Sequence, residues 1–288
     1  MSKHPTLDIS LNNYSVPHIA AKPRFRKGGY NSTNRFLSKT IVSASAAEEP
    51  DPPAFTNTAS VLFDGVDERM LVADSSSLEI MGTETCGWSM WINMITGTSG
   101  EFFANKTFST SILSFRGEIS TGGRQIRWFI GSTSNFRRST AGIIPTGSWF
   151  HLFVNYDGTQ VSSGNRISFF FNGVMDSGTT GGGTVPTTIT ATTLSNSTYG
   201  GITNDGNSLN CYMDEISIWS ISSSAAQILS LYNNGVPTNL SGSTGLLHWW
   251  RMGDSASFPN IPNEVTGRPT GTLINMESGD ITSSVPGA

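Results

Sequence analysis

The sequence predicts an all-β protein built as a sandwich of antiparallel strands. Two observations carry this prediction. Only 13% of the 288 residues are charged and 31 are glycine, a composition expected of many short strands joined by tight turns. Short apolar and aromatic runs recur along the chain, and each is bounded by Gly, Asn, Ser or Pro. We therefore expect one large sandwich.

The expected strands begin at residue 60. Residues 60–74, SVLFDGVDERMLVAD, place two apolar runs around an Asp-Gly turn. Residues 88–94, WSMWINM, alternate Trp88, Met90 and Ile92 with Ser89, Trp91 and Asn93. Four further stretches have the same character: 124–131, the aromatic hairpin 148–173, 209–220 and 245–254.

One helix is expected, over residues 222–235. Ala225, Ile228, Leu229 and Tyr232 follow helical spacing there. Ser224, followed three residues later by Gln227, has the pattern of a capping box, and a glycine at 235 marks the stop. We expect this short helix to lie on the edge of the sandwich.

The chain divides into an N-terminal arm with a Pro-rich linker, residues 1–54, and a body, residues 55–288, whose tail 254–288 is irregular. Residues 1–47 hold seven Lys or Arg and one acid, and the remainder carries a net charge of −10. The arm lacks a strand or helix period. It is either a solvated tail or an extended anchor on an acidic neighbouring subunit, through Lys22, Arg24, Arg26, Lys27 and Arg35.

Other partners and compartments are less consistent with the composition. The basic run is short and the body is acidic, which argues against nucleic acid. No apolar run reaches the ~18 residues of a membrane helix, and the N-terminus lacks a signal-peptide core, so folding in cytoplasm is expected. Cys86 and Cys211 lie outside any metal or redox spacing; two buried thiols are the default, and one bridge between them stays open.

Five motifs in one order carry a family resemblance: SVLFDGVDERMLVAD, CGWSMWINM, GSWFHLFVNYDG with ISFFFNG, YGGITNDGNSLNCYMDEISIW, and SAAQILSLYNNG. Across residues 59–253 the chain resembles the laminin-G-like members of the concanavalin A-like lectin and glucanase superfamily. The resemblance implies a two-sheet antiparallel jelly roll. The tail, from HWWRMGD onward, resembles the ends of laminin-G-like structural proteins of tailed phages, marine ones in particular.

A glycosidase of this fold would need two carboxylates facing each other across one sheet. The superfamily's hydrolases carry them at alternate positions of one strand, and no such strand is found. Asp67 with Glu68, and Asp214 with Glu215, are adjacent in sequence and should point to opposite faces. A histidine within a strand beside tryptophan, as at 151, is expected to be structural. The sequence therefore predicts that the protein is not an enzyme.

A structural Ca²⁺ is a cofactor that the resemblance implies, and Asp64, Asp67 and Asp214 are its candidate ligands. Asp214 shares strand parity with Ile216 and Ile218, so its carboxylate should be buried and would need a metal or hydrogen bonds. The alternative is that Asp214 accepts backbone N–H groups and Asp64 stabilises its own turn.

The aromatic hairpin has two faces. Leu152, Val154 and Tyr156, with Ile167, Phe169 and Phe171 on the next run, match core positions. Trp149, Phe153 and Phe170 lie on the opposite faces. They form either a face for a glycan or a partner protein, or a surface covered by other parts of the structure.

The function expected from these features is that of a non-enzymatic virion structural protein of a tailed phage. The arm would tether the jelly roll to capsid or tail subunits, as a decoration or an appendage attachment, in a homo-oligomer located in the virion. The alternative is a carbohydrate-binding adhesin that recognises a host surface glycan.

Overall fold

The structure is a computed structural model, and it describes residues 55–73, 78, 80, 82–96, 99–106, 112–120, 124–189, 196–201 and 208–288. The arm and linker, 1–54, lie outside the described residues, and so do the proposed anchor residues Lys22, Arg24, Arg26, Lys27 and Arg35. No helix in the described part is long and apolar enough to cross a membrane.

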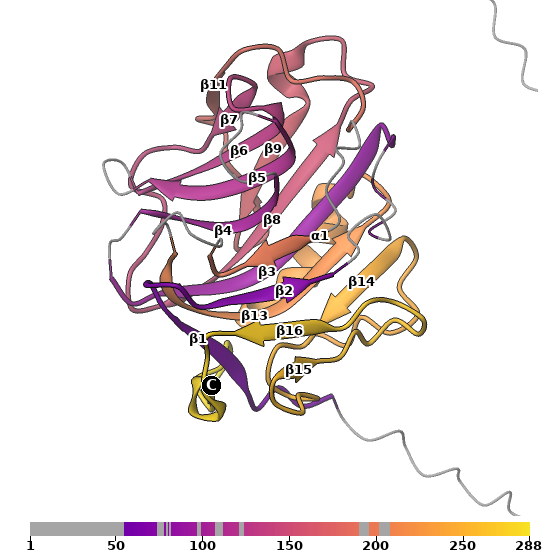
Figure 1. Cartoon of the computed structure of the whole chain (residues 1–288). Helices are drawn as coiled ribbons and strands as arrows, with labels where there is room; N and C mark the ends of the chain where they lie inside the picture. The colour runs from indigo at the N-terminus through magenta and orange to yellow at the C-terminus, as the bar shows by residue number, and fades with distance from the viewer. Residues whose placement is uncertain are drawn as a thin grey trace, which may run out of the picture. The chain divides into compact units, whose positions relative to one another are not determined.

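Two antiparallel sheets form a sandwich (Figure 1). The first sheet has the order β10 (Val174–Met175), β9 (Ile167–Phe171), β8 (Trp149–Asp157), β3 (Thr85–Met94), β13 (Asn210–Trp219), β1 (Ser60–Asp64) and β17 (Ile281–Thr282), and β14 (Leu246–Trp250) also pairs with β13. The second sheet has the order β11 (Thr180–Gly182), β7 (Phe136–Arg138), β6 (Gln125–Ser132), β5 (Ile112–Ser120), β4 (Gly100–Lys106), β12 (Ser197–Tyr199), β2 (Arg69–Val72), β16 (Gly271–Ile274) and β15 (Asn260–Ile261). The predicted all-β sandwich is confirmed.

The main core lies between the sheets and follows the alternation seen in the sequence. Trp88, Met90 and Ile92 of β3 point into it, and so do alternate residues of β8 and β9, including Tyr156 and Phe169. The rings of Trp88 and Trp128, from opposite sheets, lie 4.7 Å apart. Such alternation is expected for strands with one face against a core.

The two apolar runs around the Asp-Gly turn form β1 and β2, but these strands belong to different sheets and do not pair with each other. β1 pairs with β13 and β17, whereas β2 pairs with β12 and β16. The chain therefore crosses from one layer to the other at Gly65, whose φ of 82° is the left-handed conformation that glycine tolerates. The hairpin at 148–173 does form, with Phe153 opposite Phe170.

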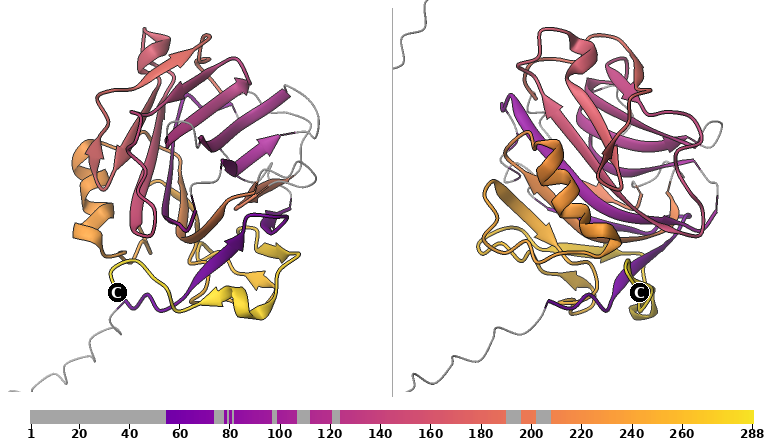
Figure 2. Two further views of the ribbon diagram at one scale, coloured as in Figure 1. Left: turned by 90° about the vertical axis from the view of Figure 1, so that its left-hand side faces the viewer. Right: turned by 180° about the vertical axis from the view of Figure 1, so that it is seen from behind.

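Helix α1 spans Ala225–Tyr232 and begins with the expected capping box between Ser224 and Gln227. It ends at Asn233, which takes the left-handed conformation two residues before the expected glycine. The helix packs on the outer face of the first sheet rather than on an edge (Figure 2). Ile228 is buried there, and Leu229, expected on the apolar side, is 51% exposed. Short 3-10 turns lie at Ser163–Asn165, Asn233–Gly235 and Ser278–Asp280.

The two cysteines do not form a bridge. Cys86 and Cys211 are both free and buried. Cys86 lies at the start of β3, whereas Cys211 on β13 pairs with Met94 at the other end of β3, so the two thiols are far apart. Burial raises the pKa of both thiols, so they remain protonated and inert in the core.

Candidate functional site

The acidic pair in β13 lies at a bulge. β13 pairs with β1 up to Met213 and with β14 from Ile216 onward, and its register against β3 shifts between Asp214 and Ser217. Glu215 has a φ of 48°, in the left-handed region. Met213 and Ile216 both point into the main core. The two acids between them are therefore displaced together to the outer side of the first sheet.

This arrangement corrects two expectations from strand parity. Asp214 and Glu215 do not point to opposite faces, and Asp214 does not share a face with Ile216 and Ile218. The extra residue of a β-bulge reverses the alternation, because two residues on one strand oppose one on its partner. Glu215 lines a narrow gap with Ser89 and His151, which are outward residues of β3 and β8.

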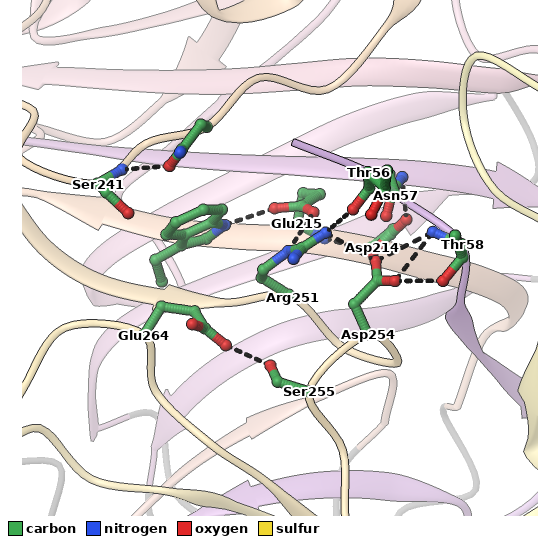
Figure 3. A network of polar contacts seen from close by, with 12 residues as sticks. Thr56, Asn57, Thr58, Asp214, Glu215, Ser241, Arg251, Asp254, Ser255 and Glu264 are labelled. Atoms are coloured by element: carbon green, nitrogen blue, oxygen red, sulfur yellow. Dashed lines mark hydrogen bonds and ion pairs between the residues drawn. The ribbon is translucent and has the colours of Figure 1, made fainter. Parts of the chain in front are cut away.

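A network of charged groups surrounds the pair (Figure 3). Arg251 places its Nε 3.2 Å from Glu215 Oε1 and its Nη2 2.9 Å from Asp254 Oδ2, and it also donates to the carbonyl of Thr56. Asp254 accepts from the backbone N–H of Thr58 at 2.9 Å and from its hydroxyl. The network thus holds residues 56–58 against the bulge of β13 and the end of β14.

Burial dominates the electrostatics of these acids. Asp214 is completely buried, and burial together with the neighbouring Glu215 raises its pKa well above the ordinary range. Burial also raises the pKa of Glu215 to about 7, although the bonds from Trp249 and Arg251 favour its charged form. Asp214 accepts hydrogen bonds from Asn57 Nδ2 at 2.9 Å and from the N–H of Glu215 at 2.8 Å.

The proposed calcium ligands do not come together around Asp214. On β1, Asp64 is opposite Asn210, four residues before Asp214 on β13, a separation of ~13 Å along a strand. Asp64 accepts from the N–H of Val66 at 2.7 Å, and Asp67 accepts from Asn275. Among the described residues, no three His, Cys, Asp or Glu side chains are grouped as metal ligands. The guanidinium of Arg251 occupies the place where a cation would neutralise the acids, so this site does not fit Ca²⁺.

Phe153 and Phe170 do not form an exposed platform. They are 0% and 4% exposed and belong to a second core, which lies between the outer face of the first sheet and helix α1 with its following segment. Its other members are Trp219, Ile228, Leu240 and Trp249. Trp149 is half-buried, with its ring 6.1 Å from that of Tyr212. Phe153 and Phe170 are therefore covered by other parts of the structure, which was the second of the two alternatives for this face.

His151 is a buried structural residue. Its Nε2 lies 2.7 Å from the hydroxyl of Ser89, and its ring packs 5.1 Å from that of Trp91. Burial lowers the pKa of His151 to about 3, so the ring is neutral at ordinary pH. A neutral, enclosed imidazole supports packing rather than proton transfer.

The outer face of the second sheet carries a set of residues that motif searching along the sequence did not find. Two rows of side chains cross β4 to β7 on the side away from the main core. In one row, Glu101, Glu118, Arg127 and Arg138 are successive cross-strand partners. In the other, Arg116, Phe129 and Phe136 are successive partners. We call these seven residues the arginine–glutamate face.

Most charges on the arginine–glutamate face are paired. Arg116 bridges Glu101 and Glu118 at 3.1 Å each, and Arg127 lies 2.6 Å from Glu118. Arg138 has no carboxylate partner in the described part of the chain, and its Nε makes no hydrogen bond. Its guanidinium lies 5.0 Å from the centre of the Phe136 ring. Both residues are half-buried, so this end of the rows combines an accessible cation with an aromatic ring.

Two comparisons with known proteins agree with the fold. A family model described as the concanavalin A-like lectin/glucanases superfamily, Laminin_G_3, matches residues 64–229. The chain is similar to the structure of a putative carbohydrate binding protein from Bacteroides ovatus, with 16% identity and a TM-score of 0.55, over 81% of this chain and 62% of that protein. It is also similar to a heptameric SAP-like pentraxin from Limulus polyphemus, with 14% identity and a TM-score of 0.48, over 61% of this chain and 82% of that one.

Curated protein sequences yield no match to the chain. The family model nevertheless covers more than half of the residues, and the two-sheet architecture agrees with it. The chain belongs to the laminin-G-like family of the concanavalin A-like lectin/glucanases superfamily.

Proposed function

We propose that this chain is a non-enzymatic, lectin-like protein that binds an acidic glycan on the arginine–glutamate face. The observation that carries the proposal is the state of Arg138, a cation without a carboxylate partner that is held over the ring of Phe136. A guanidinium can bind a carboxylate or sulfate group through two parallel hydrogen bonds. The adjacent aromatic ring can pack against the C–H groups of a sugar.

The charges on this face favour binding over hydrolysis. A glycosidase needs one protonated carboxyl and one free carboxylate, ~5 to 10 Å apart. Glu101 and Glu118 are both ion-paired with Arg116, 3.1 Å from each, so both carboxylates are already engaged by a cation. In the described part of the chain, the acids with raised pKa are Glu68, Asp214 and Glu215, which are at most 8% exposed and lie outside this face.

The comparison with known structures also supports a binding role. The similar protein from Bacteroides ovatus is described as a putative carbohydrate binding protein. At 16% identity this similarity concerns the fold, and the fold alone is compatible with several functions. The case for glycan binding therefore depends on the arginine–glutamate face.

The test is a glycan array probed with the full chain, with a reducing-sugar assay on the glycans that bind. We expect signal on glycans that carry uronate, sialate or sulfate groups, and no release of reducing sugar. Signal on neutral glycans alone would overturn the choice of ligand, and hydrolysis would overturn the non-enzymatic assignment.

A second candidate is a virion structural protein of a tailed phage, in which residues 1–54 anchor the domain to capsid or tail subunits and copies of the chain assemble together. The observation that favours it is the excess of six positive charges in residues 1–47 against a net charge of −10 over residues 48–288. Cosedimentation with particles assembled without this protein tests it. Binding by the full chain but not by a chain lacking residues 1–54 would support the anchor, and no binding by either would overturn it.

A further inference from the structure

A separate pocket opens beside helix α1, on the outer side of the first sheet. Its volume is about 290 Å³, and it lies between the end of β13, the helix and the turn before β14. The arginine–glutamate face lies on the outer side of the second sheet, so the two sites are on opposite sides of the sandwich. Ligand pockets usually measure ~300 to 1,000 Å³, and this one is therefore suited to a single-ring molecule.

The pocket has an apolar base and a polar rim. Trp219 is 4% exposed and Ile221 and Leu231 are half-buried, so these three side chains close the base. Gln227 and Ser230 on the helix and Thr244 on the turn are exposed and form the rim. The base offers dispersion contacts, and the rim offers hydroxyl and amide groups for hydrogen bonds.

One rim group, the amide of Gln227, is oriented before any ligand binds. Gln227 Oε1 accepts from the N–H of Ser224 at 2.9 Å in the capping box, which holds the amide group in place. The amide's NH₂ is left with no partner in the described part of the chain, and it is a double donor. Ser230 lies one helical turn further along, so its hydroxyl is on the same side of α1. Fixed donors reduce the entropy that a ligand must lose on binding.

The lining also limits the charge of the ligand. Every polar side chain that lines the pocket is Ser, Thr or Gln, and none of the lining residues is titratable. An anion or a cation would lose hydration there without gaining a counter-charge. A pyranose ring matches the lining better, since it presents apolar C–H groups on its faces and neutral hydroxyl groups around its edge.

We infer that this pocket binds a neutral hexose unit, independently of the acidic glycan proposed for the arginine–glutamate face. A ligand of about a dozen heavy atoms in an open pocket should bind with a Kd on the order of millimolar.

Saturation-transfer-difference NMR with the full chain tests the inference. The probes are the methyl glycosides of glucose, galactose, mannose and N-acetylglucosamine, with methyl glucuronide as the charged comparison. Ser230→Trp places a large ring in the pocket, and Ala225→Trp adds the same ring to an exposed part of the helix surface outside it. We expect at least one neutral glycoside to give a signal that falls at least five-fold in Ser230→Trp and is retained in Ala225→Trp.

Two results would overturn the inference. One is the absence of signal from every neutral glycoside at a concentration ten times the expected millimolar Kd, and the other is an equal signal from the pocket variant and the control variant. If Ser230→Trp fails to fold, Thr244→Trp fills the pocket from the opposite wall and is judged in the same way. Arg138→Gln separates the two sites. A signal lost in Arg138→Gln but kept in Ser230→Trp would place the sugar on the arginine–glutamate face and would reject the pocket.

Discussion

Arg251 Nε lies 3.2 Å from Glu215 Oε1, and this ion pair joins the end of β14 to the bulge of β13. The same guanidinium contacts Asp254 and the carbonyl of Thr56, and it lies 4.4 Å from the centre of the Phe55 ring. One side chain therefore neutralises two carboxylates and fixes the first described residues of the domain. The charged cluster is a structural clamp.

Removing the positive charge of Arg251 should lower the stability of the folded protein. Arg251→Ala leaves Glu215, which is 4% exposed, without its counter-charge, and we expect the free energy of unfolding to fall by about 3 kcal/mol. Arg127→Ala is the control, because Arg127 is 36% exposed and its ion pair should contribute about 0.5 kcal/mol. Urea unfolding at pH 7 measures both values. Equal losses would show that the clamp has no special role.

Glu215 should make stability depend on pH. Its pKa is about 7 in the folded protein, above its ordinary value of 4.5, so the folded state binds the proton more tightly than the unfolded state. Stability should therefore fall as pH rises from about 4.5 to about 7. Glu215→Gln removes this titration, and its unfolding free energy should decrease less over that range. A variant with the same pH slope as the wild type would contradict the raised pKa.

His151 should act in the opposite direction. Its pKa of about 3 lies below the ordinary 6.5, so the unfolded state takes up the proton first, and stability should be lost as pH falls from 6.5 toward 3. At pH 5 the loss due to this residue is about 2 kcal/mol relative to pH 7. His151→Gln retains a partner for Ser89 and does not titrate. Urea unfolding of both proteins at pH 7 and pH 5 should show that the wild type loses more stability than His151→Gln on acidification. An equal loss in the two proteins would contradict the lowered pKa of His151.

Phe170 should be important for packing the helix layer. Phe170→Ala removes a ring that is 4% exposed and should lower the free energy of unfolding by about 3 kcal/mol. Val174→Ala, on the neighbouring strand, changes a side chain that is 67% exposed and should have little effect. Thermal or urea unfolding compares them. A near-zero change for Phe170→Ala would mean that the ring is not held in the second core.

The sequence predicted the parts of the fold that depend on simple alternation. Trp88, Met90 and Ile92 entered the core as expected, because a strand with one face against a core alternates with period two. The bulge was not predicted, since Glu215 takes a left-handed conformation that non-glycine residues seldom adopt. That one residue reversed the expected direction of the Asp214 side chain.

The arginine–glutamate face was missed for a different reason. Glu101, Glu118 and Arg138 are on three strands, and they form one row only through the register between those strands. A search along one strand cannot find a row that runs across several. The burial of Phe153 also depends on tertiary structure, because helix α1 must pack over it.

The measurement that tests the central claim most directly is the glycan array probed in parallel with the wild type, Arg138→Gln and Arg124→Gln. Both variants lose one positive charge, and Arg124 is exposed and lies outside the arginine–glutamate face. We predict that Arg138→Gln loses at least 90% of the signal on acidic glycans, in line with the ~1.5 to 3 kcal/mol of a charge-assisted hydrogen bond, and that Arg124→Gln keeps it. Equal signals from the two variants would contradict binding at this face.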